Sequence, residues 1–341
     1  MRIADFIIDR LNKKYGIKYI SLLTGNGALV LNDALVKCKD ITPICVHHEQ
    51  NAGDFALGFS KYTNGLSVVT PTTGCAATNL LTSVLSAYQD HVPILFISGN
   101  VPLKQTSRYH RLNHKINLLK LGNQEADILE IVKPITKYCA SIERSDMAQF
   151  EIDKAIDIAL TAPFGPVWID LPSDIGSSSA LVDMINYGRP LKFNPEKEIE
   201  DKIQNLIENI NVSKRPLVLC GNGIRLSNTS RQLKSFIEKY QLPCVFTYGA
   251  IDVLDFNHPL YIGRIGVRGD RAGNFSVQNA DLLLVLGACL NIPETGYVAS
   301  KFAEKAKKIA VDIRPETHKK IDIAMDEIID CELNSFFKYI L

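Results

Sequence analysis

Short apolar runs alternate with helical patterns along most of the chain. Ile3, Phe6, Ile7 and Leu11 recur at the spacing of one helix face, so the sequence predicts an amphipathic helix at its start. Beyond that helix, short apolar runs predict a series of strands. These predicted strands cover residues 19–23, 44–46, 66–70, 94–98, 167–171, 217–220, 244–247, 282–286 and 308–312.

Segments with helical spacing lie between the predicted strands. They end near residue 36, begin near residue 49, and cover 76–86, 199–210, 230–240 and 334–340. Strands that alternate with helices are typical of a parallel sheet covered on both faces. Small polar residues and prolines interrupt the alternation after Pro172, as in an interdomain linker. The sequence therefore predicts an α/β fold of two doubly wound parallel-sheet domains, residues 1–175 and 199–341, joined by a linker at 176–198.

The composition agrees with two globular domains of ordinary size. Hydrophobic residues make up 46% of the 341 residues and charged residues 22%. Lys plus Arg number 38 against 37 for Asp plus Glu, a net charge of +1, which gives no reason to expect nucleic acid or a membrane as partner. The longest apolar run, residues 280–290, is too short to cross a bilayer, and the first residues carry charges that a secretory signal avoids. We expect a cytoplasmic protein.

Neither the cysteines nor the adjacent histidines predict a metal site. The eight cysteines form no Cys-x-x-Cys pair, and most lie in apolar runs, so we expect free thiols in a reducing compartment. His47 and His48 are neighbours in the chain, so their side chains point in different directions and make a poor pair of metal ligands.

Glu49 stands where a predicted strand gives way to a helix. At the carboxyl end of a strand in an open parallel sheet, a polar side chain points into the ligand crevice. Spacing alone favours a plainer interpretation, in which Glu49 stabilises the positive end of the helix.

Two glycine-containing turns are further candidates. Residues 71–79 lead from a strand into a helix through small residues, which let backbone N–H groups approach a ligand, although an ordinary tight turn explains them equally well. Gly221-Asn222-Gly223 also follows a strand, but Leu226 replaces the third glycine of a dinucleotide fingerprint. A nicotinamide-dependent dehydrogenase is therefore the least favoured of the functions considered below, because no acidic residue lies at the expected distance after this turn.

Seven segments in collinear order resemble the acetolactate-synthase-like thiamine-diphosphate enzymes. Residues 47–60 (HHEQNAGDFALGFS), 70–80 (TPTTGCAATNL), 87–102 (AYQDHVPILFISGNVP) and 163–172 (PFGPVWIDLP) resemble the pyrimidine-binding domain of that family. Residues 215–224 (RPLVLCGNGI), 258–269 (HPLYIGRIGVRG) and 277–288 (VQNADLLLVLGA) resemble its central domain. The resemblance thus covers nearly the whole chain, with residues 1–175 as the pyrimidine-binding domain and 199–341 as the central domain.

The resemblance gives Glu49 a specific role. In these enzymes the matching glutamate hydrogen-bonds the aminopyrimidine ring of thiamine diphosphate and promotes its imino tautomer, and the activated cofactor then attacks a 2-keto acid such as pyruvate. Gly25, Thr73, Gly74 and Asn79 match positions around the cofactor. The implied activity is decarboxylation and carboligation of a 2-keto acid.

Several positions depart from the family pattern. Asn100 stands where a glutamine usually lies near the reacting carbonyl, and Asn123 precedes Gln124 where the family has phenylalanine, so the acceptor substrate stays open. Gly221, Gly223, Arg264 and Gly287 match the positions that hold a flavin (FAD) in true acetolactate synthases. Residues 291–294 replace the usual Asp-Asp-Arg-rich loop, so an empty central domain is an equal alternative to a flavin site.

The sequence lacks the Gly-Asp-Gly…Asn-Asn motif that binds the Mg²⁺ bridging the cofactor's diphosphate in this family. The resemblance therefore implies a split or truncated subunit that supplies half a site and needs a separate diphosphate-binding subunit or domain. It also implies a homo-oligomer, because related pyrimidine domains pair about a two-fold axis. The alternative is a non-catalytic regulatory or binding subunit that keeps the fold.

Overall fold

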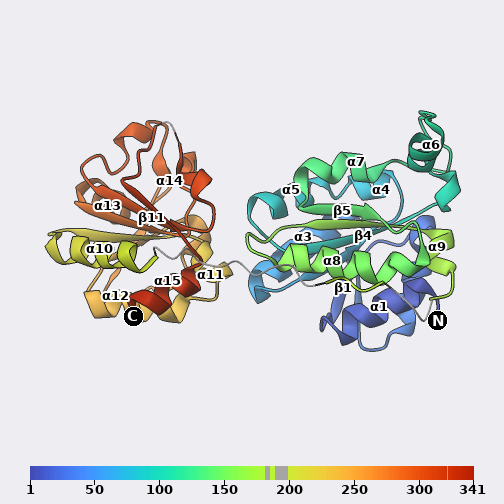
Figure 1. Ribbon diagram of the computed structural model, residues 1–341, viewed down its shortest axis with the longest axis horizontal. Helices are drawn as coiled ribbons and strands as arrows, with labels where there is room; N and C mark the ends of the chain where they lie inside the picture. Colours follow the sequence, from blue (N-terminus) through green and yellow to red (C-terminus); the bar gives the residue numbers. More distant parts are fainter. Residues whose placement is uncertain (181–184, 189–198, 321) are drawn as a thin grey trace. The chain divides into compact units, whose positions relative to one another are not determined.

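The chain forms two compact units, residues Met1–Leu191 and Lys192–Leu341 (Figure 1). The structure is a computed structural model that describes residues 1–180, 185–188, 199–320 and 322–341. Each unit is a six-stranded sheet in which every neighbouring pair of strands is parallel, with helices on both faces. The predicted α/β fold with two doubly wound sheets is confirmed.

The first unit contains six strands, which begin and end as follows: β1 (Tyr19–Leu22), β2 (Thr42–Cys45), β3 (Ser67–Thr70), β4 (Ile94–Asn100), β5 (Tyr138–Ser141) and β6 (Val167–Pro172). Its α-helices are α1 (Ile3–Lys13), α2 (Leu29–Lys37), α3 (Glu49–Thr63), α4 (Cys75–Thr78), α5 (Leu81–Gln89), α6 (Ser107–His114), α7 (Ile128–Val132), α8 (Ala148–Leu160) and α9 (Ser173–Ser177). The strand order is β2-β1-β3-β4-β6-β5.

Alternating apolar side chains of the first sheet pack on two separate layers of helices. One core joins α1, α2 and α8 to Val68, Leu95 and Ile169, and the other joins α3, α5 and α7 to Val69 and Phe96. Consecutive strand residues therefore serve opposite faces, as expected when both faces are covered. Burial on both sides leaves the carboxyl ends of the strands as the place for polar side chains.

The second unit has the following strands: β7 (Pro216–Cys220), β8 (Cys244–Phe246), β9 (Tyr261–Arg264), β10 (Leu282–Leu286), β11 (Lys307–Asp312) and β12 (Glu327–Asp330). Its α-helices are α10 (Ile199–Val212), α11 (Gly223–Leu226), α12 (Ser230–Tyr240), α13 (Arg271–Asn279), α14 (Ile292–Thr295) and α15 (Leu333–Ile340). The strand order is β12-β11-β10-β7-β8-β9, that of a dinucleotide-binding doubly wound sheet.

The segment predicted as a linker lies partly within the first unit. Ser178 and Ala180 exchange backbone hydrogen bonds with the start of the chain, since Ile3 N donates to Ser178 O at 2.9 Å and Ala180 N to Met1 O at 2.9 Å. Residues 181–184 and 189–198 of the predicted linker lie outside the described residues. The described part up to residue 180 therefore extends the first unit beyond α9.

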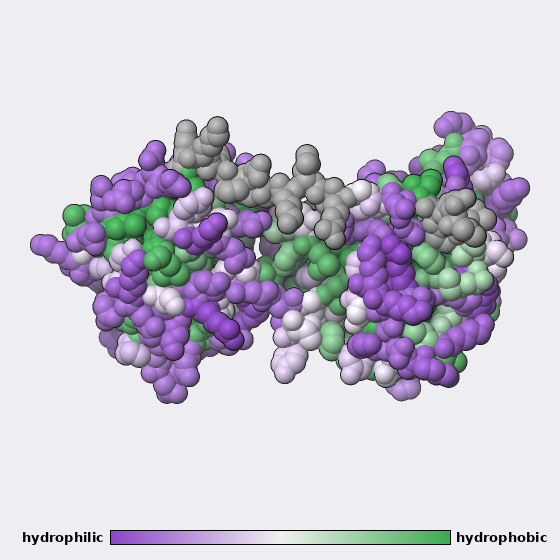
Figure 2. Space-filling model, turned by 60° about the horizontal axis from the view of Figure 1, so that its bottom comes forward, coloured by the Kyte–Doolittle hydropathy of each residue, from purple (hydrophilic) through white to green (hydrophobic). Residues whose placement is uncertain are grey.

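No helix among the described residues is long and apolar enough to cross a membrane. Figure 2 shows that hydrophilic side chains cover much of the visible face, with smaller apolar areas between them.

Candidate cofactor site at the carboxyl edge of the first sheet

The strand order of the first sheet reverses between β1 and β3. The chain passes from β1 to β2 on one side and then crosses to β3 on the other, so the loops after β1 and β3 diverge at the carboxyl edge. Ligands of open α/β sheets bind in the crevice at such a switch point. At this switch point the loop after β1 contains Gly25, and the loop after β3 contains Thr73 and Gly74. Glu49 begins α3, which follows β2.

Glu49 is the first residue of α3 and is buried, with 8% of its surface exposed. The Asn79 side-chain amide donates a hydrogen bond to Glu49 Oε2 at 2.9 Å. No described residue donates to Glu49 Oε1, and no described Lys, Arg or His forms an ion pair with this carboxylate. One carboxylate oxygen thus remains available for a ligand, and the other is fixed by the residue that follows α4.

Glycine backbones allow the crevice loops to approach one another closely. A Cβ atom on Gly25 would lie 2.3 Å from Thr72 Cγ2, and one on Gly99 would lie 2.2 Å from Gly27 O. Thr73 Oγ1 donates to Gly99 O at 3.1 Å and so links the loop after β3 to β4. Thr72 Oγ1 is buried without a hydrogen-bond partner among the described residues. The loops at this edge of the sheet therefore pack closely on one another, and Thr72 Oγ1 is a polar atom that can still form a hydrogen bond with a ligand.

Gly74 adopts a left-handed conformation, with φ of 60°, at the turn into α4. A Cβ atom there would lie 1.5 Å from Gln124 O, so the backbone of residue 124 packs directly on this turn. The Gln124 side chain itself is exposed. The sequence prediction placed Gly74 and Gln124 in one site, and the structure brings their backbones together.

Asn100 is turned away from solvent. Its Nδ2 donates to Asp170 Oδ2 at 2.8 Å, its Oδ1 accepts from Val101 N at 2.8 Å, and only 4% of its surface is exposed. Ser98 Oγ donates to the other oxygen of Asp170 at 2.6 Å. Asp170 therefore ties the end of β4 to β6, a role that the sequence analysis missed because Asp170 lies within an apolar strand.

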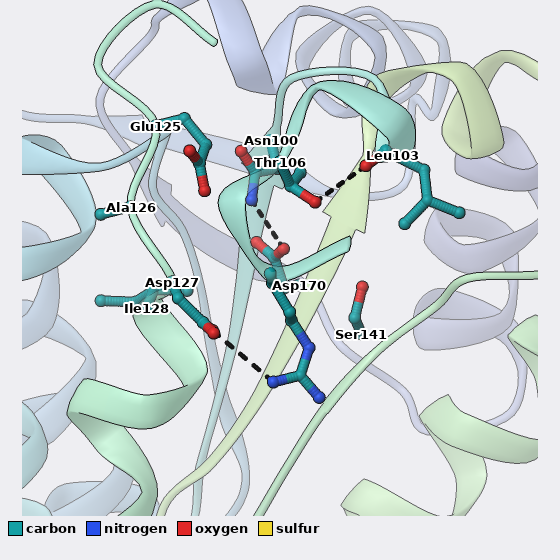
Figure 3. Close-up of a pocket in the computed structure, with 10 residues that line it drawn as sticks. Asn100, Leu103, Thr106, Glu125, Ala126, Asp127, Ile128, Ser141 and Asp170 are labelled. Carbon is teal, nitrogen blue, oxygen red and sulfur yellow. Dashed lines mark hydrogen bonds and ion pairs between the residues drawn. The ribbon is translucent and has the colours of Figure 1, made fainter. Parts of the chain in front are cut away.

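Burial raises the pKa of the Asp170 carboxyl to about 6, although the hydrogen bonds from Asn100 and Ser98 act to lower it. Beside it lies a small cavity of about 10 Å³, close to the space of one water molecule. Figure 3 shows Asn100, Glu125 and Asp170 around this cavity. Glu125 Oε1 accepts from Ser107 Oγ at 2.7 Å, whereas its Oε2 is buried without a hydrogen bond from any described residue.

Ion pairs hold α6 on the segment that leads into α7. Arg111 Nη2 lies 2.5 Å from Asp127 Oδ2 and 3.3 Å from Glu130 Oε1. Arg108 Nη1 lies 3.6 Å from Asp127 Oδ1. Glu125 and Asp127 thus connect α6 to the stretch whose backbone packs on Gly74.

The second unit has its own switch point, between β7 and β10, where Gly221, Gly223 and Gly287 meet. Gly221 N donates to Leu286 O at 2.9 Å and Gly223 N to Gly287 O at 3.0 Å, so both amides are already used. A Cβ atom on Gly221 would lie 2.1 Å from Gly287 O. These glycines let two loops interlock, and they offer no free N–H groups to a flavin's diphosphate.

Other side chains near that edge are also engaged. Arg264 forms an ion pair with Asp270, with 3.0 Å between Nη2 and Oδ1. The Lys320 ammonium donates to the carbonyls of Cys289 and Leu290 and to Asn291 Oδ1. Burial lowers the pKa of Lys320. The N–H groups of Gly221, Gly223 and Gly287 and the Arg264 guanidinium are thus all engaged within the protein.

Among residues 1–180, 185–188, 199–320 and 322–341, no group of His, Cys, Asp and Glu side chains is arranged to hold a metal ion. Glu49 is a buried carboxylate at this edge of the first sheet, and the hydrogen bond from Asn79 fixes one of its two oxygens.

The sequences of the two units match two known families of protein domains. Residues 1–125 match the family described as "Thiamine pyrophosphate enzyme, N-terminal TPP binding domain", and residues 203–332 match "Thiamine pyrophosphate enzyme, central domain". The first match contains Glu49, Asn79 and the glycine-containing loops, and the second contains the β7–β10 switch point.

Individual proteins with similar sequences are acetolactate synthase large subunits. The chain is 34% identical over 316 residues to the acetolactate synthase large subunit of Lactococcus lactis. The aligned residues cover 92% of this chain and 51% of that protein. It is 32% identical over 314 residues to the acetolactate synthase isozyme 1 large subunit of Escherichia coli, and the aligned residues cover 91% of this chain and 52% of that protein. It is 32% identical over 324 residues to a probable acetolactate synthase large subunit of Methanocaldococcus jannaschii, and the aligned residues cover 92% of this chain and 51% of that protein. The chain spans about half the length of these relatives.

Proposed function

The chain belongs to the acetolactate-synthase-like thiamine pyrophosphate enzymes, and from this premise we propose that its first unit holds and activates the cofactor's aminopyrimidine ring. The single observation that carries the proposal is Glu49, a buried carboxylate with one oxygen fixed by Asn79 and the other without a donor. A carboxyl group placed in this way can share a proton with a heterocyclic ring nitrogen because little water competes for it.

The residues around the crevice fit such a ring. Gly25 lets its loop pack directly on the Thr72 side chain and Gly74 lets its turn pack on Gln124 O, and Thr72 Oγ1 is a buried polar atom without a partner among the described residues. Asn79 fixes the Glu49 carboxylate, so the oxygen that meets the ring is oriented before the cofactor binds. Thiamine diphosphate, when bound, supplies the electron sink for reactions at a carbonyl carbon.

The proposed reaction is decarboxylation and carboligation of a 2-keto acid such as pyruvate. Similarity to acetolactate synthase large subunits supports this substrate class. Gln124 is the proposed substrate-side residue, because its side chain is exposed and its backbone lies against Gly74. Asn100, the other residue that the family resemblance suggests for the substrate side, is turned inward by its hydrogen bonds with Asp170 and Val101, so it makes no direct substrate contact in this proposal.

We further propose that the diphosphate group and its Mg²⁺ are held by polypeptide outside residues 1–341. The Gly-Asp-Gly…Asn-Asn pattern does not occur in the sequence, and the described residues contain no metal-binding cluster. The remaining half of the site would come from a separate subunit or a further domain. A flavin has no part in the proposed reaction.

The test combines the protein with a diphosphate-binding domain of an acetolactate synthase, Mg²⁺, thiamine diphosphate and pyruvate, and measures release of CO₂ and formation of acetolactate. Turnover that disappears in Glu49→Gln would support the proposal. Undiminished turnover in Glu49→Gln would refute the role of this carboxylate. Cofactor binding without turnover in every mixture would favour the alternative of a non-catalytic subunit.

A further inference from the structure

The end of β4 carries a chain of buried hydrogen bonds that the proposed reaction does not require. Trp168 Nε1 donates to Ser98 Oγ at 2.9 Å, and Ser98 Oγ donates to Asp170 Oδ1 at 2.6 Å. Asn100 Nδ2 then donates to Asp170 Oδ2 at 2.8 Å, and Asn100 Oδ1 accepts from Val101 N at 2.8 Å. A carboxylate at the centre of the chain thus connects the hydrophobic core to the loop after β4.

The lower end of this chain is rigid. Trp168 is fully buried, and its indole stacks on Phe96 with 5.1 Å between the ring centroids. Ser98 and Asp170 are register partners on the adjacent strands β4 and β6. Asp170 is therefore fixed by two strands and a stacked aromatic pair, so it can determine the position of a less constrained partner.

The upper end is the loop that leads to the candidate substrate side. Asn100 is the last residue of β4, and after Val101 the chain continues through Leu103 and Thr106 into α6. Asn100, Leu103, Thr106, Glu125 and Asp170 all line the small cavity, and a dashed line in Figure 3 marks the bond between Asn100 and Asp170. The loop and Glu125 therefore border the same space as the buried carboxylate.

We propose that Asp170 is a positioning residue, which holds the Asn100 amide inward and thereby fixes the loop of residues 101–106 beside the substrate side of the site. The expected effect of Asp170 on substrate binding rests on the proposed function. The positioning of residues 101–106 by Asp170 rests only on hydrogen bonds within the first unit. Asp170 acts through Asn100, and cofactor activation by Glu49 does not depend on it.

The protonation of Asp170 provides a way to observe this network. The charged groups that face it from the described elements are Arg108 on α6 and Glu125 and Asp127 before α7, and burial raises its pKa to about 6. Trp168 is the only tryptophan in the sequence and reaches Asp170 through one hydroxyl group. Its fluorescence should therefore report the charge of Asp170.

The first measurement is the fluorescence of Trp168 as a function of pH in the full chain. The proposal predicts an inflection near pH 6 that Asp170→Asn removes, because the amide keeps an acceptor for Asn100 but cannot titrate. Asp90→Asn is the matched control, since Asp90 is half-exposed on the same unit and pairs with Lys61, and it should keep the inflection. An inflection that persists in Asp170→Asn would overturn the proposed link.

The second measurement is a double-mutant cycle on Asp170 and Asn100. Asp170→Ala and Asn100→Ala should each accelerate amide hydrogen exchange in residues 103–106 by about tenfold, and the double variant should add little there, because both remove the bond between Asn100 and Asp170. In the completed enzyme, each should raise KM for the 2-keto acid about tenfold with a smaller change in kcat, and Asp170→Asn should restore most of the loss.

The results separate the two proposals. If Asp170→Ala does not fold, Asn100→Ala and Asp170→Asn still provide the exchange and fluorescence measurements. Exchange rates that stay at the wild-type value, or effects on KM that multiply in the double variant, would overturn the positioning role. If the protein has no turnover in any mixture, the proposed function fails, whereas the fluorescence and exchange data still decide the role of Asp170.

Discussion

The switch points of the two sheets both use glycine for close contacts between loops, but they differ in the polar groups found there. At β1 and β3 the glycine-containing loops pack closely on one another, and the same edge of the sheet contains Glu49, a buried carboxylate with one oxygen that accepts from no described donor. At β7 and β10 the glycines contact one another, and the N–H groups of Gly221 and Gly223 already donate hydrogen bonds to backbone carbonyls. The same architecture thus contains a buried carboxylate with one oxygen that has no described donor in the first unit, and glycine N–H groups that already donate within the protein in the second. A Gly-x-Gly turn therefore indicates a ligand only when its N–H groups are free.

The largest expected difference between the units is in turnover. Glu49→Gln should lower kcat of the completed enzyme by roughly 10²- to 10⁴-fold, because the amide cannot take up the ring proton. Glu208→Gln, an exposed change on α10, is the control and should leave kcat within about twofold. Steady-state kinetics with pyruvate, together with unchanged thermal unfolding of both variants, would show that chemistry rather than folding was affected. Equal kcat values for the two variants would remove the distinction between the units.

Gly74→Ala should destabilise the first unit by about 3 kcal/mol, since the left-handed backbone and the contact with Gln124 O both exclude a Cβ atom. Gly58→Ala is the matched change in α3, where a Cβ atom would meet nothing within 4 Å. It should stabilise the protein by about 0.5–1 kcal/mol through helix propensity. Denaturant unfolding measures the free energy of unfolding of both variants. A value for Gly74→Ala equal to that of the wild type would argue against the close contact between Gly74 and Gln124 O.

The stability of the first unit should depend on Asp170. Because its folded pKa, about 6, lies above the unfolded value near 3.8, the folded state binds the proton more tightly. This contribution is fully present below pH 3.8 and is lost as pH rises to 6, a change of about 3 kcal/mol. The difference in unfolding free energy between the wild type and Asp170→Asn, measured from pH 4 to 8, isolates it from other carboxylates. A difference that does not vary with pH would contradict the burial of a titrating Asp170.

Lys320→Met should give the smallest effect and tests the second unit. Methionine keeps most of the buried stem and removes both the ammonium and its desolvation cost, so the unfolding free energy should change by about 1 kcal/mol or less. Turnover of the completed enzyme should stay within about twofold. A large loss of turnover would show that the β10 edge of the second unit takes part in the reaction.

The sequence predicted the buried strands well but missed three edge strands. β5, β9 and β12 each lie at the edge of a sheet, and most of their residues are only partly buried, so their sequences show no continuous apolar run. The helix predicted at 76–86 is divided into α4 and α5, with Asn79 between them. That interruption places the Asn79 amide on Glu49, a contact that spacing along the chain does not reveal.

The candidate site was predicted in part. The resemblance to thiamine-diphosphate enzymes singled out Glu49, Gly74 and Asn79, and the structure brings Glu49 and Asn79 into hydrogen-bond contact. Asp170 was missed, because its partners Ser98 and Asn100 are about seventy residues away in sequence and become neighbours only through strand pairing. A charged residue within an apolar strand was the one signal available, since such a residue needs buried partners.

The central claim is that Glu49 Oε1 meets the aminopyrimidine ring, and a structure of the completed enzyme with thiamine diphosphate and Mg²⁺ tests it most directly. We predict that Glu49 Oε1 lies within about 2.6–3.2 Å of a ring nitrogen while Asn79 still donates to Oε2. A bound cofactor whose ring lies elsewhere, with Glu49 paired to another protein side chain, would contradict it.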